Sequence, residues 1–199
     1  MDGLGVDRAV LVGSSFGGFL GTNLAVLEPD RVAALALLAP AATFKPFRLF
    51  ANVLIRTGSL LPLPATVKPG LRRMMQGALP GARIVEQMEI GVAGFRYDRS
   101  SIYPTELPDE DVAAISCPTL LLLGDREMIY DPQAAARRAR GLLRQSTVDV
   151  IEGVGHLLGM QRPDLVNPRI VDFLDGLSAL PVPRPVPMPL AVPVAGASS

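Results

Sequence analysis

A serine flanked by glycines near the start of the chain constrains the fold more than any other feature. The run Arg8-Ala-Val-Leu-Val-Gly-Ser-Ser-Phe-Gly-Gly18 is typical of a buried strand, a sharp turn and a helix, with Ser15 at the apex. So tight a turn leaves little space beside its apex, so we expect glycine to be required at Gly13 and Gly17. The Ser15 hydroxyl would then lie at the carboxyl end of the strand, facing the first N–H groups of the helix.

The same glycine-rich run could in principle hold a phosphate group. That use requires Lys followed by Ser or Thr, or the spacing Gly-x-Gly-x-x-Gly, and this run has neither. We therefore interpret Ser15 as a nucleophile.

Length and composition limit the number of domains and the classes of partner that this chain can have. The 199 residues are enough for one hydrophobic core, and a formal net charge of zero gives no reason to expect nucleic acid as a partner. The single cysteine, Cys117, excludes an internal disulfide, and we expect it to be a buried packing residue. We predict no metal and no cofactor. Neither a signal peptide nor a membrane span is evident, so a cytoplasmic protein is expected.

Buried strands and helices alternate along the chain, which predicts an α/β fold with a parallel sheet and flanking helices. Asp131 precedes a proline at the start of one helix, as an N-cap residue does. The expected strands are residues 9–12, 32–38, 119–123 and 147–151, and the expected helices are residues 16–27, 132–143 and 167–177.

The segment between the second and third strands has a different character. Apolar residues recur at helical spacing near 47–56, 67–77 and 83–95, and prolines separate these stretches. We expect a helical lid at about residues 42–112, in which Met88 and Phe95 either line an apolar substrate pocket or simply pack the lid onto the sheet. The domain would cover residues 1–178, followed by a proline-rich tail at 179–199 that is expected to be extended or disordered.

A serine nucleophile needs a base, and the base needs an acid that orients it. His156 is the only histidine of the chain and follows the fourth strand, after two glycines that allow the loop to bend. The loop after the third strand, Gly124-Asp-Arg-Glu127, offers two carboxylates, Asp125 and Glu127.

Together these three loops resemble those of the α/β-hydrolase fold, whose nucleophile elbow is Gly-x-Ser-x-Gly and whose chain order is serine, acid, histidine. The run Gly124-Asp-Arg-Glu-Met-Ile-Tyr-Asp-Pro132 is similar to that of lid-bearing bacterial carboxylesterases. The resemblance places the acid three residues after the glycine, at Glu127, where most members have aspartate. Asp125 lies next to the strand end, so we expect it to face solvent or to pair with Arg126.

The resemblance also implies a mechanism and a set of substrate-binding groups. Ser15 would form an acyl-enzyme with a small-molecule carboxylic ester, with His156 as base and acid and Glu127 holding the imidazole. The backbone N–H of Phe16 would donate to the oxyanion, with Ser14 beside it at the substrate-binding surface.

The chain departs from that family in one respect. Full-length members have about eight strands with the elbow after the fifth, so the first four strands and the loop carrying a second oxyanion donor have no counterpart here. The strand at Ala9–Val12 would then be an unpaired apolar edge. We weigh a fragment of a longer product, a short protein that dimerises through this edge, and a second polypeptide that completes the fold. We favour the first and expect the isolated chain to be a weak, poorly soluble esterase.

Other functions are compatible with the same residues. Carbon–carbon bond hydrolysis or perhydrolysis would use the same serine, histidine and acid. An inactive remnant could act as an interaction module, although such a module has no need of all three groups.

Overall fold

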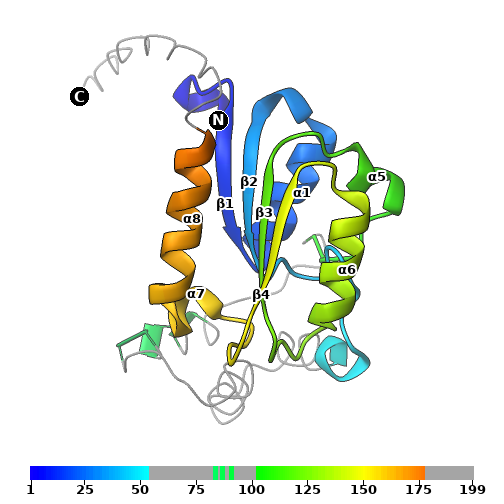
Figure 1. Cartoon of the computed structure of the whole chain (residues 1–199), viewed down its shortest axis with the longest axis vertical. Coiled ribbons are helices and arrows are strands. Elements are labelled where there is room, and N and C mark those ends of the chain that lie inside the picture. Colours follow the sequence, from blue (N-terminus) through cyan, green and yellow to red (C-terminus); the bar gives the residue numbers. More distant parts are fainter. Residues whose placement is uncertain (54–82, 85, 88–89, 92–101, 178–199) are drawn as a thin grey trace, which may run out of the picture.

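Four parallel strands form the centre of the molecule and lie in the order β1-β2-β3-β4 (Figure 1). Because all four run in the same direction, their carboxyl ends meet at one edge of the sheet. The computed structural model describes residues 1–53, 83–84, 86–87, 90–91 and 102–177. The strands are β1 (Ala9–Ser14), β2 (Val32–Leu38), β3 (Thr119–Gly124) and β4 (Ser146–Ile151).

Helices cover both faces of the sheet. Figure 1 shows α8 on one side and α1, α5 and α6 on the other. Two separate apolar clusters fill the spaces between sheet and helices, one on each face. The helices that lie wholly within the described residues are α1 (Phe16–Leu27), α5 (Asp109–Ala114), α6 (Pro132–Leu142), α7 (Leu158–Gln161) and α8 (Pro163–Leu177), with short 3-10 turns at Asp2–Leu4 and Pro29–Arg31.

The sequence prediction of an α/β fold with a parallel sheet is confirmed. Strands β2 and β3 are almost continuously apolar and buried, as strands covered on both faces are. Asp131 caps α6 by accepting a hydrogen bond from the Ala134 N–H at 3.0 Å, and this bond lowers the pKa of the Asp131 carboxyl. Cys117 is a free, buried residue of the core, as expected.

The prediction for the start of the last helix is wrong. Helix α8 begins at Pro163, so Pro168 lies inside it instead of opening it. Proline inside a helix removes one backbone hydrogen bond. Here the neighbouring Leu165, Val166 and Ile170 pack against the sheet, and this tertiary packing outweighs the local preference.

Most of the expected lid lies outside the described residues, as do Met88, Phe95 and the tail at 179–199. Of the predicted helical stretches, residues 49–53, 83–84, 86–87 and 90–91 are helical. Helix α5, near the end of the expected lid, packs against α6 and α1 on the sheet face. Its Val112 is fully buried in the same cluster as Leu35 and Leu121.

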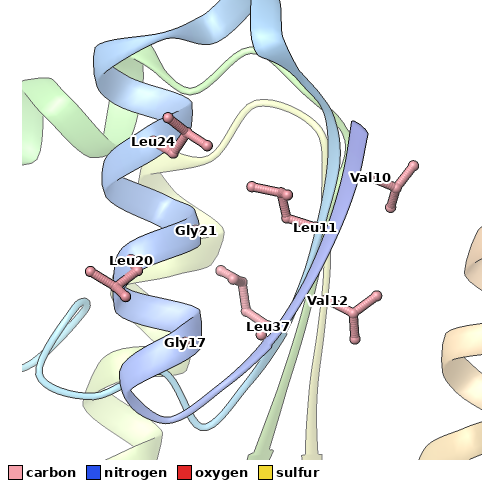
Figure 2. A pocket seen from close by; sticks show the side chains of 9 residues that line it. Val10, Leu11, Val12, Gly17, Leu20, Gly21, Leu24 and Leu37 are labelled. Carbon is pink, nitrogen blue, oxygen red and sulfur yellow. The ribbon is translucent and has the colours of Figure 1, made fainter. Parts of the chain in front are cut away.

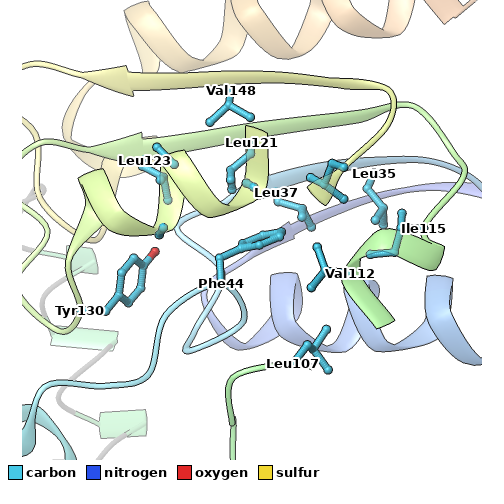
Figure 3. Packing of buried hydrophobic residues seen from close by; sticks show 14 of the residues in the cluster. Leu35, Leu37, Phe44, Leu107, Val112, Ile115, Leu121, Leu123, Tyr130 and Val148 are labelled. Atoms are coloured by element: carbon cyan, nitrogen blue, oxygen red, sulfur yellow. The ribbon is translucent and has the colours of Figure 1, made fainter. Parts of the chain in front are cut away.

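The buried side chains on this face include one unpaired polar group. Figure 3 shows Tyr130 within the apolar cluster that also contains Phe44 and Leu123. Tyr130 is 1% exposed, and its hydroxyl has no hydrogen-bond partner within the described part of the chain. Burial, together with the charge of Glu127, raises the pKa of the Tyr130 phenol well above its usual value.

In the part of the chain that the structure describes, strand β1 lies at the edge of the sheet, as predicted for Ala9–Val12. Its outward side chains Val10 and Val12 are 38% and 52% exposed. Between β1 and α1 lies an apolar groove of about 320 Å³, whose lining includes Leu11 of β1, Leu37 of β2, and Leu20 and Leu24 of α1 (Figure 2). Such an edge favours pairing with another chain, and dimerisation through it stays a prediction.

We expect Val12→Lys to reduce self-association, because a lysine on an edge strand opposes strand pairing and the exposed side chain has room for it. Size-exclusion chromatography with light scattering would measure the change in mass. Val171→Lys on α8 is the matched control, since Val171 is also 52% exposed. A wild-type chain that stays monomeric at all concentrations would contradict the dimer.

We expect Tyr130→Phe to raise the free energy of unfolding by about 1 kcal/mol, because it removes a buried hydroxyl that has no partner among the described residues. The gain should widen above about pH 10, where the unfolded wild-type tyrosine ionises and the buried one does not. Urea unfolding at neutral and alkaline pH measures both effects.

Tyr103→Phe is the control for this measurement. The Tyr103 hydroxyl donates to Asn52 Oδ1 at 2.6 Å, so its loss should destabilise the protein. If both substitutions lowered the free energy of unfolding equally, the Tyr130 hydroxyl would have a hydrogen-bond partner in solution, and the prediction would be wrong.

Candidate active site

The junction of β1 and α1 holds Ser15 in an unusual backbone conformation, with φ 50° and ψ −115°. A Cβ on Gly13 would lie 2.5 Å from the Gly17 carbonyl oxygen, so residue 13 must be glycine. A Cβ on Gly18 would lie 2.9 Å from Pro40 Cβ. A Cβ on Gly17, by contrast, would have no described atom within 4 Å, so the steric requirement falls on Gly13 and Gly18 and our expectation for Gly17 is wrong.

Backbone hydrogen bonds from the neighbouring strand end fix this turn. The Ser15 N–H donates to the Leu38 carbonyl at 2.9 Å, and the Ala41 N–H donates to the Ser15 carbonyl at 2.9 Å. Two alanines of the same loop, Ala39 and Ala42, also have positive φ, at 43° and 53°. Non-glycine residues rarely adopt this region, and such strain gathers at functional sites.

The three side chains singled out from the sequence form one continuous chain of hydrogen bonds. His156 Nε2 lies 2.8 Å from Ser15 Oγ, and His156 Nδ1 lies 2.5 Å from Glu127 Oε2. The other carboxylate oxygen, Glu127 Oε1, accepts from the Ile129 N–H at 2.9 Å. Each oxygen of the buried carboxylate therefore has a donor, as a buried charge requires.

This pairing assigns the protons of the imidazole. An ionised carboxylate only accepts hydrogen bonds, so Nδ1 of His156 carries the hydrogen and Nε2 is left to accept from the Ser15 hydroxyl. The Tyr130 ring lies edge-on to the imidazole, with centroids 6.5 Å apart and an interplanar angle of 86°. His156 and Glu127 are 1% and 3% exposed, whereas Ser15 is half-buried and can be reached from outside.

The groups expected to bind an oxyanion lie beside Ser15. Phe16 is the first residue of α1, so its N–H has no acceptor within the helix. Ser14 ends β1 as an exposed residue, and the Phe16 side chain is also exposed. Within the described residues, no group of three or more His, Cys, Asp or Glu could hold a metal.

Asp125 is exposed, as expected, but it also makes a contact that the sequence did not suggest. Its Oδ1 accepts a hydrogen bond from the Val154 N–H at 3.1 Å, on the loop that carries His156. None of the ion pairs among the described residues joins it to Arg126. The Arg126 N–H donates to the Val154 carbonyl at 2.9 Å.

A second side chain, that of Gln161, also contacts the loop that carries His156. The Gly155 N–H donates to Gln161 Oε1 at 2.8 Å. Sequence reasoning missed the contacts of Asp125 and Gln161 because neither follows from a motif.

The arrangement can perform nucleophilic chemistry. The imidazole can take the hydroxyl proton as Ser15 attacks a carbonyl, and the carboxylate can stabilise the imidazolium that results. Backbone N–H groups at the start of α1 are placed to interact with negative charge that develops near Ser15.

Most of this chain is similar in sequence to known proteins. The sequence pattern of the alpha/beta hydrolase family matches residues 1–169. The uncharacterized carboxylesterase nap of Bacillus subtilis is 30% identical over 87% of this chain and 59% of its own length. Carboxylesterase YbfK of the same organism is 29% identical over 88% of this chain and 60% of its own length.

Comparison with solved structures also identifies a carboxylesterase as similar to this chain. The crystal structure of naproxen esterase from Bacillus subtilis superposes with a TM-score of 0.77 at 32% identity, over 85% of this chain and 61% of the esterase. The chain thus spans about 60% of the length of the relatives it matches. Within the described residues, no helix combines the length and apolar character needed to cross a bilayer. On the match of residues 1–169, the chain belongs to the alpha/beta hydrolase family.

Proposed function

We propose that the chain carries the catalytic residues of a carboxylic ester hydrolase that forms an acyl-enzyme on Ser15. The observation that supports this most directly is the unbroken chain from Ser15 Oγ through the His156 imidazole to Glu127, at 2.8 and 2.5 Å. The names of the relatives, carboxylesterase and naproxen esterase, favour an ester as the substrate class.

In the first half-reaction, Ser15 Oγ attacks the ester carbonyl while His156 Nε2 takes its proton. The carbonyl oxygen becomes an oxyanion near the Phe16 N–H, and Glu127 stabilises the imidazolium. When the tetrahedral intermediate collapses, the carbon–oxygen bond to the alcohol breaks and His156 gives its proton to the departing alkoxide. The acyl group stays on Ser15.

In the second half-reaction, water replaces the alcohol. His156 takes a proton from the water as the oxygen attacks the acyl carbon, and it then returns that proton to Ser15 Oγ as the carboxylic acid leaves. Every step uses the same imidazole, so the reaction depends on its two hydrogen bonds being kept.

The substrate pocket is a finer proposal. The segment at about 42–112 would form a lid in which Met88 and Phe95 contact the acyl or alcohol group, and Ser14 would lie at the pocket rim.

A non-catalytic interaction module is the competing function. A buried carboxylate such as Glu127 is costly unless its partners compensate it, and here both oxygens are paired within the site. A surface used only for binding gains nothing from this arrangement, which favours the catalytic proposal.

A fluorophosphonate probe tests the proposal without requiring turnover. We expect stoichiometric labelling of Ser15, located by peptide mass spectrometry. Ser15→Ala should abolish labelling, and His156→Ala should slow it by at least about 100-fold, because the general base is lost. Ser146→Ala is the control, since Ser146 lies at the opposite, amino end of β4. Labelling at another residue, or unchanged labelling of His156→Ala, would refute the proposal.

A further inference from the structure

We propose that Asp125 and Gln161 are positioning residues for His156. Each holds one of the two peptide N–H groups that precede this histidine, and the two side chains come from different elements. The inference rests on the proposed function of Ser15, His156 and Glu127, and it adds two residues to which no role in that function has been given.

Asp125 binds the histidine loop to the loop that carries the acid. Its Oδ1 accepts from the Val154 N–H at 3.1 Å, while the next residue, Arg126, donates its N–H to the Val154 carbonyl at 2.9 Å. Val154 is fully buried, so water cannot readily replace either bond. Both polar groups of Val154 are thus held by consecutive residues of the acid loop.

The spacing along the chain links this contact to the catalytic pair. Asp125 and Val154 are 29 residues apart, and Glu127 and His156 are also 29 residues apart. The pairing of β3 with β4 ends at Gly124 and Ile151, one residue before Asp125 and three residues before Val154. On each loop, the Asp125–Val154 contact lies two residues before the catalytic pair. We infer that this contact aligns the two loops so that Glu127 and His156 meet.

Close packing makes this alignment tight. A Cβ on Gly124 would lie 2.1 Å from the Val154 carbonyl oxygen and 2.6 Å from that of Gly155. The acid loop therefore lies directly against the backbone of the histidine loop, with no side chain between them.

Gln161 holds the next peptide group. Its Oε1 accepts from the Gly155 N–H at 2.8 Å, and it reaches the loop from the end of α7 (Leu158–Gln161). The loop contains Gly153, with φ 74°, and Gly155, so its own sequence does little to restrict its conformation. External anchors are needed to give the imidazole one position.

The imidazole tolerates little displacement, because it must keep bonds of 2.8 and 2.5 Å to two different side chains. A shift of about 1 Å in a reacting group can lower a rate about 100-fold. Asp125 is exposed and its contact goes to a peptide N–H, so the acceptor oxygen and not the charge is expected to matter.

Amide hydrogen exchange followed by NMR tests the contacts without relying on activity. We expect Asp125→Ala to accelerate exchange at the Val154 amide and Gln161→Ala to accelerate it at the Gly155 amide. Asp125→Asn and Gln161→Glu keep the acceptor oxygen and should preserve protection. Glu152→Ala, an exposed carboxylate at the start of the same loop, is the matched control. Unchanged protection in both alanine variants would overturn the inference.

The imidazole gives a second, spectroscopic readout. His156 is the only histidine, so its ring signals need no assignment by mutation. The hydrogen between Nδ1 and Glu127 should give one sharp downfield resonance in the wild type and a broadened one in both alanine variants. A resonance that is unchanged in both would also overturn the inference.

Phosphonate labelling kinetics connect position to reactivity. The alanine variants should lower the maximal labelling rate roughly 10- to 100-fold at an unchanged half-saturating probe concentration, and the Asn and Glu variants should recover most of that rate. A loss in Asp125→Asn equal to that in Asp125→Ala would assign the effect to charge and refute positioning. If the wild type does not label at all, the proposed function fails, while amide exchange still decides whether these contacts exist.

Discussion

Parallel pairing of the four strands is the constraint on which everything else depends. It places Ser15 at the same edge of one sheet as Glu127 and His156, although 141 residues separate Ser15 from His156 along the chain. The apolar β2 and β3 are buried on both faces and make this sheet the rigid centre of the molecule. The functional groups then lie on short loops after the strands, where the backbone is free to curve but its starting points are fixed.

The features that could be predicted from the sequence are those that depend on local pattern. Continuous apolar runs predicted β2 and β3, and the order of glycines around Ser15 predicted the turn before α1. His156 could be singled out because it is the only histidine. The start of α8 could not be predicted, since its position depends on packing against the sheet and the sequence signal at Pro168 is opposed by that packing.

The contacts of Asp125 and Gln161 illustrate a more general limit. Both side chains bind peptide N–H groups, and peptide groups are nearly the same at every position of the sequence. Their partners are therefore decided by where the loops lie in three dimensions and leave no trace in residue spacing. The same holds for glycine: only the position of Pro40 beside α1 shows that Gly18, and not Gly17, lacks space for a side chain.

The conformation of Ser15 depends on the neighbouring end of β2 as much as on the glycines that flank Ser15. Leu38 and Ala41 bind its peptide groups, and the positive φ angles of Ala39 and Ala42 shape the loop that makes this possible. Transplanting the pentapeptide Gly13–Gly17 into another scaffold would therefore not reproduce the reactive geometry. A graft would also have to include the segment 38–42, placed so that Leu38 and Ala41 can still bind the peptide groups of Ser15.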